Sequence, residues 1–481
     1  MTDTATLQQI RSPLDTIVDP ESIALVGITV NNPDHWTRTF LDALLEFGFD
    51  KPLYLVNPKG GEIRGLKVYS DVGDIPGRIE YVISTVPARA SSALVYACAK
   101  KGVKVIHFCT AGFSEIGTEE GRELERQLVE AGRQTGIRLL GPNCMGPYCP
   151  GSRIAFEPSM PHESGPVGYV SQSGGNVNVL VRQSVPRGVR FSKVFSYGNA
   201  SDINECDLLE YLASDPETRI IAMYLEGVRD GPRFKRALSN AVRAKPVVVL
   251  KGGVTEGGAR AVHGHTASLA GKTSTWEALC RQTGAINVAN LDEMADVLVT
   301  LRFMQSPKGK RALLFGGGGG ASVLMTDAFE RNGLVVPPLP PEDVQKLREF
   351  SPDAGNILRN PLDYSQSFFD REMVLRAMKI ASSPDSIDFV VAFMCAAAAP
   401  SRVGTWLADT TGAMLEAMKD CPKPSAAVIE PRVTPKEQES IFAMIQAFVS
   451  AKVPVYYSFD TAARAISLVL DNEENRRKRA G

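Results

Sequence analysis

The sequence has almost no net charge, no signal-peptide core and no long apolar run. Its 53 Lys and Arg residues are balanced by 54 Asp and Glu residues, so the formal net charge is −1 and no basic excess favours nucleic-acid binding. No apolar stretch reaches the roughly 18 residues that are needed to span a bilayer. The N-terminal segment Met1–Gln8 is polar. We therefore expect a soluble, cytoplasmic protein that binds neither nucleic acid nor membrane.

The cysteines also lack a pattern. They stand at positions 98, 109, 144, 149, 206, 280, 395 and 421, and none forms a Cys-x-x-Cys pair or another metal-ligand spacing. In a cytoplasmic chain such cysteines are expected to be buried, reduced thiols. The sequence therefore predicts neither a disulfide framework nor a bound metal ion.

What the sequence does contain is an alternation of strands and helices. At roughly 150 residues per domain, 481 residues predict about three domains. Short apolar runs such as Ile23–Val26 and Val103–Cys109 alternate with helical segments, which is typical of a doubly wound parallel α/β sheet. A linker rich in Pro and Gly, Pro147–Pro166, separates the first alternation from a second one. We expect domains at residues 1–148, 160–305 and 306–481.

Four loops of the first domain follow predicted strand ends. The loop Gly27–Asp34 begins where a nucleotide pyrophosphate could meet a helix N-terminus, but it lacks the second and third glycines of the dinucleotide fingerprint. NAD is therefore less favoured than another adenine-containing ligand. The loops Val56–Gly61, Thr85–Ala88 and Thr110–Glu115 are expected to ring one site, with Lys59 as a cation for phosphate. Ordinary turn chemistry is the alternative explanation.

In the second domain, the segment Tyr169–Asn176 joins a predicted strand to a predicted helix. Ser171 and Ser173 supply hydroxyl groups, and a helix that starts near Gly174 would supply free N–H groups and the positive end of its dipole. This combination favours an anion-binding cradle. The alternative is an ordinary helix N-cap.

A histidine stands among small residues after the predicted strand Pro246–Leu250. The segment Lys251–Gly271 surrounds His265 with glycines, which let backbone N–H groups approach an anion closely. This pattern favours a loop that carries a phosphate-handling imidazole, and the alternative is a mobile surface loop with an incidental histidine. Glu226 follows another strand and could accept a hydrogen bond from that imidazole, which would fix its tautomer and activate its other nitrogen.

The glycine run Gly316–Gly320 follows a predicted strand in the third domain. It lacks the Gly-Lys-Ser/Thr ending of a P-loop. We therefore predict a βα turn of close backbone approach there, and not an ATP site.

Taken together, these motifs resemble the α subunit of the NDP-forming acyl-CoA synthetases, the family that contains ADP-forming acetyl-CoA synthetase and succinyl-CoA synthetase. The resemblance covers nearly the whole chain. Its most specific parts are Gly165–Gly175, Tyr197–Asp202, Tyr224–Gly227 and Gly264–Gly271. It implies a CoA-binding Rossmann-like domain followed by two flavodoxin-like parallel-sheet domains.

The resemblance also implies roles for individual residues. In this family a histidine matching His265 is transiently phosphorylated and the residue matching Glu226 supports it, whereas the neighbouring His263 lies outside the family's His-Thr-x-Ser context. The implied phosphate-binding residues are Ser171, Ser173, Gly174, Gly264 and Thr266. The implied coenzyme A-binding residues are Gly27, Asn57, Pro58, Lys59, Val86, Pro87, Thr110, Gly112 and Asn143.

The implied reaction interconverts acyl-CoA, ADP and phosphate with a carboxylic acid, CoA and ATP, through an acyl phosphate and a phosphohistidine. The family's ATP-grasp domain has no counterpart in this chain. The resemblance therefore implies a separate ATP-grasp β subunit that binds ATP or ADP with Mg²⁺, in an α2β2 heterotetramer. The small carboxylic acid, the choice between ADP and GDP and the physiological direction stay open.

Two other functions compete with this one. A non-catalytic CoA-binding or regulatory protein could retain the fold, but it would need neither His265 nor Glu226. An NAD-dependent dehydrogenase is disfavoured because the fingerprint is missing and because Asn57 stands where an acidic ribose-binding residue is expected. Ala267 replaces a glycine that is common in the family's histidine loop, so a diverged acid substrate is compatible with the sequence.

Overall fold

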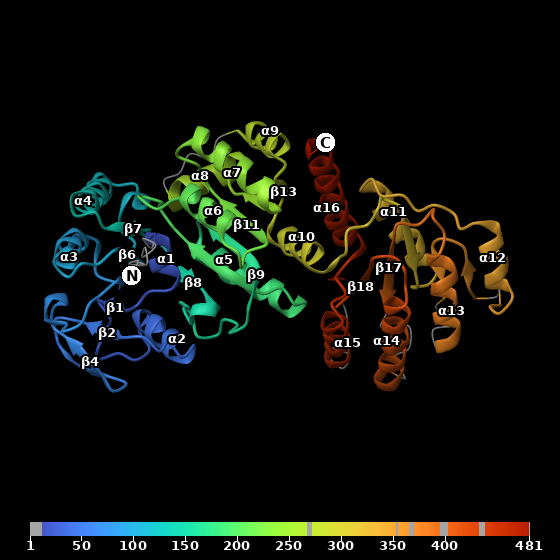
Figure 1. Cartoon of the computed structure of the whole chain (residues 1–481), viewed down its shortest axis with the longest axis horizontal. Coiled ribbons are helices and arrows are strands. Elements are labelled where there is room, and N and C mark those ends of the chain that lie inside the picture. The colour runs from blue at the N-terminus through green and yellow to red at the C-terminus, as the bar shows by residue number, and fades with distance from the viewer. Residues whose placement is uncertain are drawn as a thin grey trace, which may run out of the picture. The chain divides into compact units, whose positions relative to one another are not determined.

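The computed structural model describes residues 12–266, 272–352, 355–364, 370–394, 403–431 and 438–480, with only the backbone described for 263–266, 403–407 and 479–480. The described strands form three sheets, and the chain divides into two compact units (Figure 1). The first unit comprises Met1–Val181 and Arg190–Ala289, and the second comprises Arg182–Val189 and Asn290–Gly481. All three sheets are largely parallel, which confirms the predicted α/β class.

The first sheet lies at the N-terminal end of the chain. Its strands are β1 (Ile23–Val26), β2 (Leu53–Val56), β3 (Gly61–Ile63), β4 (Leu66–Tyr69), β5 (Tyr81–Ser84), β6 (Val105–Phe108) and β7 (Arg138–Leu140). They are ordered β3-β4-β2-β1-β5-β6-β7, with an antiparallel pairing at β3. Helices α1 (Pro13–Val18) and α2 (Thr39–Glu46) lie on one side, and α3 (Ala88–Lys100) and α4 (Glu119–Thr135) on the other (Figure 1). Covered on both faces, β1 and β5 are fully buried.

The second sheet belongs to the same unit. Its strands are β8 (Gly146–Tyr148), β9 (Ser164–Ser171), β10 (Phe191–Ser196), β11 (Ile220–Leu225), β12 (Val247–Lys251) and β13 (Ile286–Val288), ordered β13-β12-β11-β9-β10-β8. Its helices are α5 (Gly174–Ser184), α6 (Glu205–Ser214), α7 (Gly231–Ala244), α8 (Glu256–Thr266) and α9 (Thr273–Thr283). The carboxyl ends of β9, β11 and β12 are neighbours, so the loops that follow these strands meet at one edge of the sheet.

Two segments differ from the sequence-based expectation. Within the predicted linker, β8 pairs antiparallel with β10 as an edge strand, where Pro147 is tolerated because one side of the strand carries no partner. After β12, a loop was predicted, yet Glu256–Thr266 is helical. The Oγ1 atom of Thr255 accepts the N–H of Gly258 at 3.0 Å, and Glu256 favours the positive end of the dipole. These end contacts act together with the packing of α8 against the 3₁₀ turn η3 (Ser114–Ile116), since tertiary packing supplies most of the stability of a short helix.

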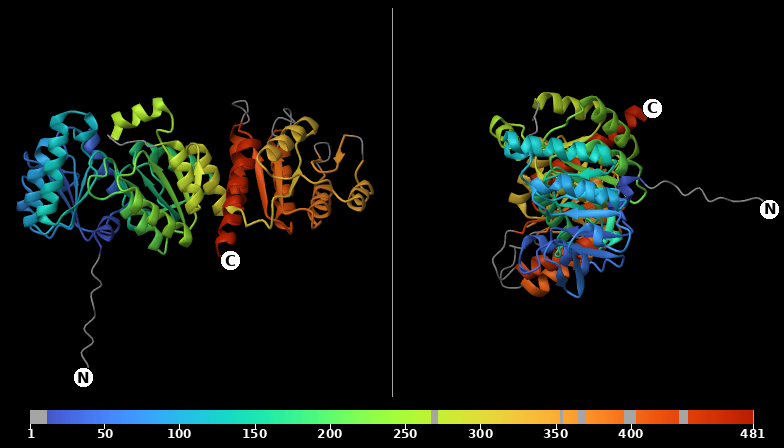
Figure 2. Two further views of the ribbon diagram at one scale, coloured as in Figure 1. Left: turned by 90° about the horizontal axis from the view of Figure 1, so that it is seen from above. Right: turned by 90° about the vertical axis from the view of Figure 1, so that its left-hand side faces the viewer.

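The second unit contains the third sheet. Its strands are β14 (Ala312–Phe315), β15 (Ile357–Leu358), β16 (Leu362–Asp363), β17 (Phe389–Met394), β18 (Ser425–Ile429) and β19 (Val455–Tyr456), and its helices are α10 (Leu291–Phe303), α11 (Gly319–Arg331), α12 (Pro341–Arg348), α13 (Arg371–Ser382), α14 (Val403–Lys419), α15 (Gln438–Ser450) and α16 (Phe459–Ala480). The long α16 packs beside α10 and α11 (Figure 2). A buried ion pair, Arg187 Nη2 to Asp296 Oδ1 at 2.6 Å, ties Arg182–Val189 to α10.

The glycine run after β14 forms the predicted turn. Gly316, Gly317 and Gly318 have φ angles of 96°, 104° and 88°, which residues other than glycine rarely adopt. The N–H of Gly318 donates to the buried carboxylate of Asp363 at 3.0 Å.

Within the described ranges, no helix is long and apolar enough to cross a membrane.

A buried histidine in β6 makes folding stability depend on pH. His107 is fully buried, its Nε2 lies 3.0 Å from the carbonyl oxygen of Cys144, and its Nδ1 has no hydrogen-bond partner among the described residues. Burial lowers the pKa of His107 from 6.5 to about 4. The folded state therefore resists protonation that the unfolded state accepts below about pH 6.5.

We expect the contribution of His107 to stability to be full above about pH 6.5 and to fall as the pH drops towards 4. A displacement of about 2.5 pKa units corresponds to a loss of up to about 3 kcal/mol. Urea unfolding of wild type and His107→Gln between pH 4.5 and 7.5 measures this. The variant should lose less stability over that range, and equal pH slopes would contradict the assignment.

Candidate functional site

The loops after β1 and β5 approach each other closely at the centre of the first sheet. Gly27 follows β1 with φ 92°, and a Cβ atom on it would lie 2.9 Å from the backbone of Thr85 and Val86. Only glycine fits this contact without displacing the neighbouring loop. Pro87 is the N-cap residue of α3, so the segment Thr85–Pro87 leads directly from β5 into the helix. The predicted residues Gly27, Val86 and Pro87 therefore lie together at the point where the strand order reverses.

The loop after β2 is tied to the loop after β1. The amide of Asn57 donates from Nδ2 to the carbonyl of Ile28 at 2.9 Å, and its Oδ1 accepts the N–H of Lys59 at 3.0 Å. Pro58 and Lys59 are exposed. Asn57 thus shapes the turn that presents Lys59.

The loops after β6 and β7 complete this edge of the sheet. Thr110 donates from Oγ1 to the carbonyl of Val86 at 2.6 Å, and its own carbonyl accepts the N–H of Asn143 at 3.0 Å. Asn143 has a φ of 60°, and the N–H of Gly112 donates to Glu115 at 2.5 Å. All nine residues that were predicted to bind CoA lie in the loops or at helix starts after β1, β2, β5, β6 and β7.

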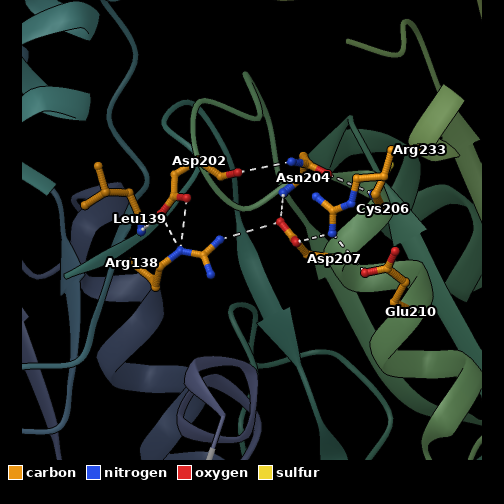
Figure 3. Close-up of polar contacts among 8 residues, drawn as sticks. All are labelled: Arg138, Leu139, Asp202, Asn204, Cys206, Asp207, Glu210 and Arg233. Carbon is orange, nitrogen blue, oxygen red and sulfur yellow. Dashed lines mark hydrogen bonds and ion pairs between the residues drawn. The ribbon is translucent and has the colours of Figure 1, made fainter. Parts of the chain in front are cut away.

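The loop after β10 joins the second sheet to the first. Asp202 accepts the guanidinium of Arg138 through Oδ1 and Oδ2 at 3.0 and 2.8 Å, and its Oδ2 also accepts the N–H of Leu139 at 2.8 Å (Figure 3). Asp207 extends the network, because it lies 3.6 Å from Arg138 and 2.7 Å from Arg233. Charged groups therefore link β7 of the first sheet to α6 and α7 of the second.

Asn199 makes a second link from the same loop. Its Nδ2 donates to Glu115 at 2.6 Å and to Glu125 at 3.0 Å, and all three residues are buried. The Oε2 of Glu125 also accepts the hydroxyl of Ser114 at 2.5 Å. Arg229, three residues after Glu226, donates to the carbonyl of Asn199 at 2.8 Å. The loop after β10 is thus fixed to the α4 side of the first sheet and to the loop that carries Glu226.

The predicted anion cradle follows β9. Ser171 is buried and donates its hydroxyl to the carbonyl of Ser173 at 2.7 Å, so it shapes the turn from within. Ser173 is partly exposed, and its Oγ accepts the N–H of Asn176 at 3.4 Å, which leaves its own hydrogen for a further acceptor. Gly174 begins α5, where a side chain would collide with Met145. The N-cap contact is present, and the cradle would consist of Ser173 and the first turn of α5.

Glu226 is buried directly after β11. Its carboxylate accepts the hydroxyl of Tyr224 at 3.0 Å. The pKa of Tyr224 is raised, first by burial and then by the negative charge of Glu226. A buried carboxylate at a strand end of a parallel sheet lies where ligands of such sheets bind.

The predicted phosphohistidine segment lies in the last turn of α8. Gly264, His265 and Thr266 all belong to this helix, and their side chains lie outside the described part of the structure. Helix α8 packs against the 3₁₀ turn η3 (Ser114–Ile116), which follows the Gly112 loop of the first sheet. The backbone therefore brings the helix that carries His265 next to the predicted CoA loops.

A pocket of about 700 Å³ lies between α4 and the loops after β10 and β11. Ser114 and Glu125 line it from the first sheet, and Ser201, Val228 and Arg229 line it from the second. In the described residues, no group of three or more His, Cys, Asp or Glu side chains could hold a metal ion. The chemistry that this arrangement offers is hydrogen bonding and charge pairing.

Several residues that make important contacts lie in segments that the sequence analysis named, but no role was predicted for them. Asp202 and Asn199 stand inside the segment Tyr197–Asp202, and Gln172 stands between the two cradle serines. Their contacts link loops that are distant in sequence, so no local pattern could have revealed them.

Comparison with known proteins gives matches for both halves of the first unit. Residues 21–150 match the CoA binding domain family, and residues 164–301 match the succinyl-CoA ligase like flavodoxin domain family. Two relatives from Pyrococcus furiosus, the α subunits of ADP-forming acetate–CoA ligases I and II, are 35% and 34% identical over 73% and 79% of this chain. The matches cover 76% and 82% of those relatives.

Longer proteins and a solved structure match as well. ADP-forming acetate–CoA ligase I from Archaeoglobus fulgidus is 37% identical over 72% of this chain, which spans 50% of that protein. The structure of a dinucleotide forming acetyl-coenzyme A synthetase 1 from Ca. Korarchaeum cryptofilum, in complex with phosphate and ADP, has a TM-score of 0.82 and 28% identity. The match covers 96% of this chain and 97% of that chain.

We expect Asp202→Ala to destabilise the first unit by about 2–3 kcal/mol, because it removes a charged hydrogen-bond network and leaves the N–H of Leu139 without its acceptor. Chemical unfolding of the full chain measures this. Glu123→Ala is the matched control, since it removes an exposed ion pair with Arg126 on α4 and should change nothing measurable. Equal effects of the two substitutions would refute the structural role of Asp202.

Proposed function

The chain belongs to the family of ADP-forming acid–CoA ligase α subunits, and we propose that it binds CoA on its first sheet and carries the transferred phosphoryl group on His265. As a member of this family it is the α subunit of an acid–thiol ligase, and its N-terminal domain is a CoA-binding domain. The single observation that best supports the residue assignment is the convergence of the predicted loops. The CoA loops, the Ser173 cradle, Glu226 and α8 all belong to one compact unit.

In the proposed reaction, an oxygen of inorganic phosphate attacks the thioester carbon of acyl-CoA. The C–S bond breaks, and the products are an acyl phosphate and the CoA thiolate, which takes up a proton. A ring nitrogen of His265 then attacks phosphorus, and the carboxylic acid leaves with the electrons of its P–O bond. The phosphohistidine passes the group to ADP. Each step is reversible, and dividing the transfer into two lets one residue serve two separated sites.

Glu226 would accept a hydrogen bond from the ring nitrogen of His265 that does not react. This contact fixes the tautomer before the attack and stabilises the positive charge that the ring gains. The buried position of Glu226 strengthens such an interaction, because few water molecules screen it. Ser173 and the first turn of α5 would hold the phosphate oxygens.

We place nucleotide chemistry on a second chain. The two Pyrococcus furiosus relatives are named as α subunits, which implies a partner, and the Archaeoglobus fulgidus relative is about twice as long as the part that this chain matches. We propose that the partner is an ATP-grasp β subunit that binds ADP or ATP with Mg²⁺, that the assembly is α2β2, and that it acts in the cytoplasm. Charge neutralisation by Mg²⁺ and positioning of the phosphates would be the partner's contribution.

Mixed with its candidate ATP-grasp partner, Mg²⁺ and labelled ATP, the wild-type chain should take up acid-labile label. His265→Ala should take up none, and His263→Ala should label normally, because the family context falls on His265. Label that persists in His265→Ala would disprove the assignment. An unlabelled wild type that still binds CoA would favour a non-catalytic CoA-binding protein.

CoA binding should depend on Lys59. Trp36 begins the 3₁₀ turn η1 (Trp36–Arg38) after the Gly27 loop and is 50% exposed, so CoA bound there should quench its fluorescence. We expect Lys59→Met to weaken CoA binding about tenfold, or about 1.4 kcal/mol, through the loss of a cation near a phosphate. Lys100→Met, at the C-terminal end of α3, is the control and should bind CoA as wild type does. An unchanged affinity in Lys59→Met would remove this residue from the site.

A further inference from the structure

A buried lysine contacts the backbone of Glu226, the residue that we propose supports His265. Lys251 is the last residue of β12, pairs in register with Leu225 of β11, and is only 7% exposed. Its ammonium donates to the carbonyl of Glu226 at 2.7 Å and to the carbonyl of Gly252. Both of these hydrogen-bond acceptors are backbone carbonyls.

A glutamine holds the same peptide from the opposite side. Gln172 follows β9, between the two cradle serines, and is 3% exposed. Its Oε1 accepts the N–H of Glu226 at 2.7 Å and the N–H of Gly227 at 3.2 Å. The backbone N–H of Gln172 donates to the carbonyl of Tyr224 at 3.1 Å. Since β9 and β12 flank β11, the side chains of Gln172 and Lys251 contact the backbone at Glu226 from both neighbouring strands.

This arrangement is costly for stability alone. A buried ammonium whose hydrogen bonds go only to carbonyl groups loses much of its hydration, and no hydrogen bond to a carboxylate compensates for that loss. Accordingly, burial lowers the pKa of Lys251, although the charge of Glu226 opposes that shift.

We propose that Lys251 and Gln172 are positioning residues for Glu226, and that Gln172 connects the segment of the anion cradle to the backbone of that residue. The inference rests on the role proposed above for Glu226 and His265. Lys251 fixes the carbonyl side of the Glu226 peptide, Gln172 fixes its N–H side, and Tyr224 holds the carboxylate. With its main chain held on both sides and its carboxylate bonded to Tyr224, Glu226 has less freedom to move than an unsupported side chain after a strand would have.

The charged and titratable groups around Glu226 set the expected pH effect. Among the described residues, Tyr224 bonds to its carboxylate, and Lys251 and buried Tyr197 interact with its charge; Glu205 in turn acts on Tyr197. Lys251 is the cation of this group, and a nearby cation favours an ionised carboxylate. Removing that cation makes Glu226 easier to protonate, so activity should be lost at a higher pH on the acid side.

The test compares Lys251→Met and Gln172→Met with a matched control. Lys245 follows α7, and its ammonium likewise donates to two backbone carbonyls, those of Leu212 at 2.6 Å and Asp215 at 2.5 Å, so Lys245→Met removes equivalent contacts away from Glu226. The rate of His265 phosphorylation by the partner chain and ATP is measured against pH, and CoA affinity is measured separately. We expect both test variants to be slowed at least tenfold with CoA affinity within twofold of wild type, and Lys245→Met to keep the wild-type rate.

The pH profile separates positioning from a purely structural role. The acid limb should move to higher pH in Lys251→Met and return towards the wild-type position in Lys251→Arg, which keeps the charge. A Lys251→Met profile that matches wild type in rate and acid limb would overturn the inference, as would equal slowing in Lys245→Met. If Lys251→Met does not fold, Gln172→Met alone decides by its rate. Failure of the wild type to label His265 would instead contradict the proposed function itself.

Discussion

The proposed site depends on the contacts that hold the loop after β10 against the first sheet. Asp202 binds Arg138 and the N–H of Leu139, and Asn199 bridges the buried carboxylates of Glu115 and Glu125. These contacts join two sheets that each have their own core. Backbone hydrogen bonds from Ser201 to Gly141 and from Ile203 to Leu139 act alongside them. Together these contacts hold the loops that are assigned to CoA beside the loop that carries Glu226, as the proposed transfer from a thioester to a phosphate requires.

Several loops of the proposed site are held by side chains that bind backbone groups. Gln172 and Lys251 contact the peptide at Glu226, Asn57 contacts the carbonyl of Ile28, and Thr110 contacts the carbonyl of Val86. Each of these side chains binds a strand-end loop other than its own. The main-chain partner of each contact is present whatever residue stands there. Such contacts therefore hold the loops in place independently of the side chains of the residues that are bound.

The sequence correctly predicted the fold class and the strand ends that carry the predicted residues. It could do so because apolar runs between helical segments indicate buried strands. The run at Ile23–Val26 coincides with β1, and the run at Pro246–Leu250 overlaps β12. It was wrong about the segment after β12, where Thr255 and Glu256 start a helix despite the glycines. It did not reveal the roles of Asp202, Asn199 or Lys251, because their partners lie at least 25 residues away in the chain. The resemblance to a family, and not spacing, supplied the assignment of His265.

The central claim is that this chain by itself contains the site where an acyl phosphate and His265 exchange a phosphoryl group. The most direct measurement is phosphorus NMR of the isolated full chain incubated with a set of short acyl phosphates, without nucleotide or partner. The account predicts a phosphohistidine signal in the wild type that disappears in His265→Ala. The absence of that signal, in a chain that its partner and ATP do phosphorylate, would contradict the claim and would place part of the acyl phosphate site on the partner.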